Sequence, residues 1–95
     1  MPVYRANLTT MLSTTMRSSF ANQGQICLCG SRILVERPIY DRFVKAFVAK
    51  TKQLRVGPPD QTGVQIGAVV SQAHRDKILS YIQLAIDEGG TVECG

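Results

Sequence analysis

The sequence lacks an apolar run long enough to cross a membrane, and no charged and apolar leader stands at its start. A membrane-spanning helix needs roughly 20 consecutive apolar residues, whereas the runs here are only a few residues long. The cysteines number three, and an odd count does not suit a secreted disulfide scaffold. We therefore expect no disulfide, no membrane partner and a cytoplasmic protein.

Patterns for binding metal or nucleic acid are also missing. Cys27 and Cys29 could supply two soft ligands, but only the isolated Cys94 and His74 are left to complete a zinc site. The net charge of +4 comes from eleven Lys and Arg against seven Asp and Glu, with no basic run of five or six. We expect no metal and no nucleic acid.

The residues that are present predict helices alternating with strands. Asn7 caps a first helix that ends at Gly24. Residues 32–36 are apolar and rich in branched side chains, which favours a buried strand. Pro38 then starts a second helix that runs to about Leu54. One face of this helix is apolar and is expected to pack on a sheet, with the stripe Tyr40, Phe43, Val44, Phe47, Val48 and Thr51.

The second half of the chain repeats this alternation. Residues 55–63 have the prolines and glycines of a loop. Ser71 caps a third helix that stops at Gly89 and Gly90, and residues 91–94 begin another strand. The buried stripe expected on the third helix is Ile78, Leu79, Ile82, Ala85 and Ile86. The pattern predicts an α/β fold, with about three helices packed on a small, mainly parallel sheet.

Cys27 is the candidate for chemistry. It lies just past a glycine turn and just before a predicted strand. Free backbone N–H groups on such a loop can stabilise an oxyanion formed when the thiol attacks a carbonyl. The alternative is a small buried apolar residue, since free cysteine is often buried. Cys29 is expected to be such a residue.

The residues around Cys27 carry a resemblance. The pattern Phe-x-Asn-x-Gly-Gln-x-Cys, followed by a small residue and Ser-Arg, is that of the active-cysteine segment of the NAD(P)-dependent aldehyde dehydrogenases. The matching positions are Phe20, Asn22, Gly24, Gln25, Cys27, Gly30, Ser31 and Arg32. The resemblance continues over nearly the whole chain, from about Ala6 onward. The neighbours of Cys27 look most like the branch that oxidises muconic-type semialdehydes, including 2-aminomuconic and 2-hydroxymuconic semialdehyde.

The resemblance implies a thiohemiacetal mechanism. The Cys27 thiolate would attack an aldehyde carbon, hydride would pass to the nicotinamide of NAD or NADP, and water would hydrolyse the thioester to a carboxylate. The backbone N–H of Cys27 would be one oxyanion donor. The family's second donor is an asparagine side chain well upstream, which this chain does not contain.

Other parts of the family's catalytic apparatus are also missing from this sequence. The general base lies in a Glu-Leu-Gly-Gly motif about thirty residues before the cysteine, whereas Cys27 has only twenty-six residues before it. The cofactor-binding domain precedes that motif. The resemblance therefore implies that residues 1–95 are a single segment of a catalytic domain, expected to be inactive and to bind no cofactor alone.

His74 and Lys77 are the candidate cofactor contacts. Aligned through Gly67, they match a polar and lysine pair that in the family can reach the adenosine ribose. The alternative is a structural histidine and a solvated lysine at a helix start. The resemblance further implies a small-molecule aldehyde substrate and a homo-oligomeric enzyme. A hypothesis from another class is a free-standing small binding or assembly module derived from the same fold.

Overall fold

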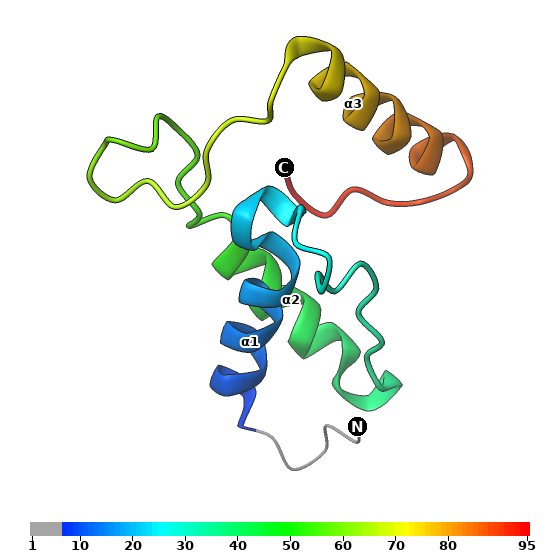
Figure 1. Ribbon diagram of the computed structural model, residues 1–95. Coiled ribbons are helices and arrows are strands. Elements are labelled where there is room, and N and C mark those ends of the chain that lie inside the picture. Colours follow the sequence, from blue (N-terminus) through cyan, green and yellow to red (C-terminus); the bar gives the residue numbers. More distant parts are fainter. Residues whose placement is uncertain (1–6) are drawn as a thin grey trace.

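A computed structural model describes residues 7–95 and shows an open arrangement of helices (Figure 1). The chain forms, in order, α1 (Leu8–Phe20), the short 3-10 helices η1 (Ala21–Gly24) and η2 (Arg37–Ile39), α2 (Tyr40–Thr51) and α3 (Gln72–Asp87). None of the helices in the described part of the chain has the length and apolar character needed to span a membrane.

Both predicted helix caps are confirmed. The Asn7 side-chain oxygen accepts a hydrogen bond from the Thr9 backbone N–H at 2.8 Å. The Ser71 hydroxyl oxygen accepts from the His74 backbone N–H at 3.1 Å. A helix leaves its first N–H groups without backbone partners, so these side chains define where α1 and α3 begin.

Two helices end several residues before the positions predicted from the sequence. The α-helical part of α1 ends at Phe20 and not at Gly24, because Ala21 has an extended ψ of 141° and the backbone is left-handed at Asn22. The second helix ends at Thr51 and not near Leu54. The Leu54 N–H donates to the Thr51 carbonyl at 3.1 Å, so a tighter turn follows α2 in place of α-helix.

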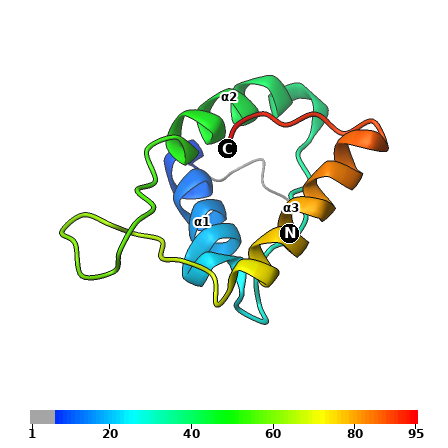
Figure 2. The same cartoon turned by 90° about the horizontal axis from the view of Figure 1, so that it is seen from above.

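The core lies between α1 and α2, which pack side by side (Figure 2). Its most buried side chains are Leu12 of α1 and Phe43 of α2. Phe47 lies between two other aromatic rings, with centroids 5.6 Å from Phe43 and 5.9 Å from Phe20. The stacking of Phe20 on Phe47 ties the end of α1 to the middle of α2, immediately before the segment that carries Cys27.

The predicted sheet does not form among residues 7–95. Val56 and Ile66 make one isolated parallel bridge there, and residues 32–36 and 91–94 are not in strands. A strand needs a neighbour to accept and donate its backbone hydrogen bonds, and no such partner is present in the described part. The apolar stripe of α2 accordingly packs on α1 and not on a sheet.

The expected burial of the α3 stripe is wrong for this structure. Ile78, Leu79, Ile82 and Ile86 are each 37–45% exposed. Within the described residues, α3 makes no packing contact with another helix, and Figure 1 shows it apart from the α1–α2 pair. Helical spacing gives α3 an apolar face, but burial of that face depends on a partner surface.

Candidate active-site loop around Cys27

A left-handed turn ends the helical part before Cys27. The φ angles of Asn22, Gln23 and Gly24 are +50°, +58° and +73°. Asparagine and glycine enter this region more readily than other residues. A side chain at Gly24 would also bring its Cβ within 3.3 Å of the Ser19 carbonyl oxygen. The turn directs the chain away from the axis of α1 and places Cys27 on a loop.

Hydrogen bonds attach the loop after Cys27 to the C-terminal end of α1. The Gly30 N–H donates to the Ser18 carbonyl at 3.0 Å and lies 3.2 Å from the Ser18 hydroxyl oxygen. The Ser19 hydroxyl donates to the Gly30 carbonyl at 3.3 Å. A Cβ at residue 30 would lie only 2.7 Å from the Ser18 hydroxyl oxygen. A larger residue there would displace the Ser18 hydroxyl, and the Gly30 end of the loop of residues 25–30 is fixed to the end of α1.

Cys27 is the most accessible of the three thiols. Its side chain is exposed, whereas those of Cys29 and Cys94 are half-buried, and all three are free. The alternative of a buried apolar Cys27 is thus not supported by this structure. Among residues 7–95, the Cys27 backbone N–H donates to no protein acceptor. A free N–H beside an exposed thiol matches the arrangement expected for an oxyanion donor.

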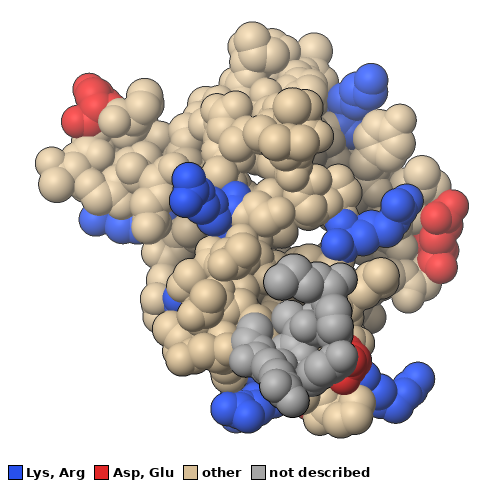
Figure 3. All heavy atoms as spheres, turned by 60° about the horizontal axis from the view of Figure 1, so that its bottom comes forward, with Lys and Arg blue, Asp and Glu red and all other residues tan. Residues whose placement is uncertain are grey.

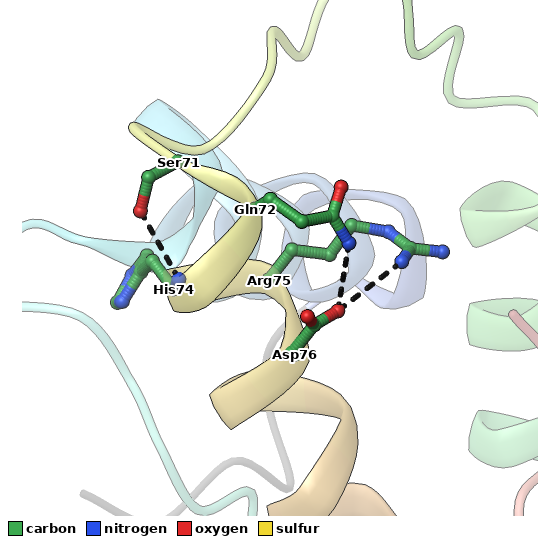
Figure 4. Close-up of polar contacts among 5 residues, drawn as sticks. All are labelled: Ser71, Gln72, His74, Arg75 and Asp76. Carbon is green, nitrogen blue, oxygen red and sulfur yellow. Dashed lines mark hydrogen bonds and ion pairs between the residues drawn. The ribbon is translucent and has the colours of Figure 1, made fainter.

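His74 and Lys77 lie on the first two turns of α3, and their spacing of three places them on neighbouring positions of one helix face. The half-buried His74 ring points away from the exposed Arg75–Asp76 ion pair, whose atoms are 3.5 Å apart (Figure 4). Lys77 is exposed and makes no ion pair with another described residue.

The structure does not join the three predicted site residues into one site. Cys27 lies on the loop after α1, and His74 and Lys77 lie on α3, which does not pack on α1 or α2 within the described chain. No hydrogen bond in residues 7–95 links Cys27 to either of them. The loop of Cys27 is therefore described here as one candidate site, and the face of α3 as another.

The described residues form no metal cluster, and one face of the molecule shows no concentrated charge. On the face in Figure 3, Lys and Arg side chains are interspersed among other residues. No group of three or more His, Cys, Asp or Glu in residues 7–95 is placed to hold a metal ion.

Comparison with known proteins identifies the family. The family described as "Aldehyde dehydrogenase family" matches residues 3–95. Over 90 residues the chain is 50% identical to 2-aminomuconic semialdehyde dehydrogenase of Homo sapiens. The aligned region is 95% of this chain and 18% of the human protein. Over 85 residues it is 49% identical to 2-aminomuconic 6-semialdehyde dehydrogenase of Pseudomonas sp., covering 90% of this chain and 17% of that protein. The chain belongs to the aldehyde dehydrogenase family.

A solved structure of another aldehyde dehydrogenase contains a segment with the fold of this chain. Betaine aldehyde dehydrogenase from Staphylococcus aureus, determined in complex with NAD+, superposes with a TM-score of 0.92 at 33% identity. The superposition covers 97% of this chain and 18% of that one. The chain therefore has the fold of a segment of an aldehyde dehydrogenase and spans less than a fifth of the length of these relatives.

Gln23, in the turn before the Cys27 loop, was not identified from the sequence as a functional residue. Gln23 has a left-handed backbone, and its half-buried side chain lies beside Gly67. Glutamine is not among the residues enriched in that backbone region, so composition gave no signal for it. Its position between Asn22 and Gly24, in the turn before a candidate nucleophile, is the feature that could have indicated it.

Proposed function

We propose that this chain is the nucleophile-bearing segment of a longer NAD(P)-dependent aldehyde dehydrogenase that oxidises a semialdehyde of the muconic type to a carboxylate. The observation that carries the proposal is the exposed Cys27 on its fixed loop, inside a chain that matches this family over residues 3–95. The substrate class is supported by the names of the human and Pseudomonas relatives. The segment alone is inactive in this proposal, because its sequence contains no Glu-Leu-Gly-Gly general-base motif.

Cys27 acts as the nucleophile in this proposal. Its sulfur forms a bond to the aldehyde carbon, and the former carbonyl oxygen takes up negative charge near the Cys27 backbone N–H. After oxidation the carbon remains bonded to sulfur as a thioester. Water then cleaves the carbon–sulfur bond, which releases the carboxylate and regenerates the thiol. The exposed side chain and the unused N–H support both roles.

His74 and Lys77 hold the ribose hydroxyls of the cofactor in the same proposal. NAD, when bound, supplies the hydride acceptor for the reaction. The two side chains fit this role because they share one face at the start of α3, and the Lys77 ammonium is not occupied by a described carboxylate. A lysine offers three N–H donors to hydroxyl oxygens. The NAD+ complex of the Staphylococcus aureus relative supports the choice of cofactor.

The α/β sheet predicted from the sequence also belongs to the longer enzyme. We propose that residues 32–36 and 91–94 become strands when segments outside this chain supply their neighbours. Leu34 supports this, since its side chain is 89% exposed in an apolar segment. The exposed apolar face of α3 would be covered in the same assembly.

A graft tests the proposal directly. The matching 90 residues of human 2-aminomuconic semialdehyde dehydrogenase are replaced with the corresponding residues of this chain. We expect the graft to oxidise the semialdehyde and reduce NAD, as measured by absorbance of the reduced cofactor. A graft that folds to the native size but shows no turnover would contradict the proposal.

The role of Lys77 is tested in the same graft. Lys77→Ala should raise the KM for NAD by about two- to tenfold, the loss expected for one hydrogen bond, and leave the KM for the aldehyde unchanged. Lys45→Ala is the matched control, because Lys45 is an exposed lysine on α2. An unchanged KM for NAD in the Lys77 variant would refute the contact.

A further inference from the structure

The turn before Cys27 is held in an unfavourable backbone conformation. Asn22 has φ 50° and ψ 45°, and Gln23 has φ 58° and ψ 24°. Two successive residues with side chains are thus left-handed, a conformation in which the Cβ lies too close to the carbonyl oxygen. Such a backbone persists only where surrounding contacts hold it. The contacts that hold this turn therefore also determine where the Cys27 loop begins.

The side-chain amide of Gln23 supplies those contacts. In the orientation in which each amide atom faces a complementary partner, its oxygen accepts from the Gly67 N–H at 3.0 Å. Its nitrogen donates to the Asn22 carbonyl at 2.8 Å and to the Asn22 side-chain oxygen at 3.1 Å. One side chain thus connects both left-handed residues to a segment that is distant in the sequence. Gly67 lies four residues before Ser71, which caps α3.

We infer that Gln23 is a positioning residue for Cys27, an inference that rests on the proposed function of Cys27 as the nucleophile. One end of the cysteine loop is anchored by Gly30 on Ser18, and Gln23 anchors the other end on Gly67. With both ends fixed, the Cys27 sulfur keeps one position relative to the segment that leads into α3. Loss of the Gln23 amide releases the left-handed turn and allows the sulfur to move away from a productive attack position.

The contact itself is tested in this chain by hydrogen exchange of the Gly67 backbone N–H. Gln23→Met removes the amide at similar length and should accelerate this exchange at least tenfold. Gln23→Glu keeps an oxygen for Gly67 and should leave the rate within threefold. Gln61→Met is the matched control, because Gln61 is an exposed loop glutamine whose side chain makes no hydrogen bond in residues 7–95. An equal Gly67 rate in the original chain and in Gln23→Met would overturn the inference, as would an unprotected Gly67 in the original chain.

The effect on Cys27 is tested in the graft with the human enzyme. Gln23→Met should lower kcat about tenfold or more while the KM values for aldehyde and NAD stay within twofold, because a misplaced nucleophile slows chemistry and not binding. Gln23→Glu should recover part of kcat, and Gln61→Met should leave it unchanged. An unchanged kcat in Gln23→Met overturns the positioning role. A graft that is inactive with Gln23 intact counts against the proposed function, and the Gly67 exchange then still decides whether the contact exists.

Discussion

Cys27→Ser should reduce turnover of the human-enzyme graft to the background rate. A serine hydroxyl is a far weaker nucleophile than a thiolate, and no described residue makes a hydrogen bond to the Cys27 side chain that could activate a hydroxyl in its place. The structural change is small, because residue 27 is exposed and its side chain contributes little packing. The measurement is the steady-state rate of cofactor reduction, with folding checked by circular dichroism.

Cys29→Ser is the matched control for this experiment. Cys29 has the same chemistry two residues further along the loop, but its side chain is half-buried and its N–H donates to the Ile26 carbonyl at 2.9 Å. The variant should keep most of the turnover and lose a modest amount of stability. Equal loss of turnover in both variants would mean that substitutions anywhere in this loop disturb its structure. That result would contradict the assignment of Cys27 as the nucleophile.

Phe43→Ala should destabilise this chain by about 3–5 kcal/mol, the range for truncating a buried aromatic side chain. Phe43 is 4% exposed and stacks on Phe47, so the substitution leaves a cavity beside one of the two buried apolar side chains of residues 7–95. A small domain has a total stability of only about 5–15 kcal/mol. The loss should therefore be seen as a lower urea midpoint in unfolding followed by helical circular dichroism.

Tyr81→Ala provides the comparison for Phe43. Tyr81 is an aromatic residue on α3 that is 62% exposed. Its truncation should change the free energy of unfolding by less than about 0.5 kcal/mol, as is usual at exposed positions. A loss as large as that of Phe43→Ala would show that α3 is packed in solution and that the core extends beyond α1 and α2.

The surface area agrees with a core confined to α1 and α2. The chain exposes 7935 Å², whereas a compact monomer of this mass exposes about 5,400 Å². The excess of roughly 2,500 Å² is larger than the roughly 800 Å² that each partner buries in a standard protein interface. Apolar side chains of α3 and of residues 32–36 contribute to it, including Leu79 and Leu34. These are the surfaces that the proposed longer enzyme would cover.

The sequence by itself determined the features that depend on near neighbours in the chain. Asn7 and Ser71 mark helix starts because their side chains bind N–H groups two or three residues away. The glycine turn before Cys27 was expected from Gly24, whose backbone is left-handed in the structure. The spacing of motif residues from Phe20 to Arg32 gave the family, which the comparisons confirm.

Only the tertiary structure decided which surfaces meet. The apolar stripes of α2 and α3 look alike in sequence, yet α2 packs on α1 and the α3 stripe remains exposed. The contact of Gln23 with Gly67 likewise has no local signal. Periodicity shows that a face is apolar but not what covers it, because burial depends on residues far away in the chain or outside it. The glycine turn before Cys27 was thus readable from the sequence, and the contacts that hold the loop in place were not.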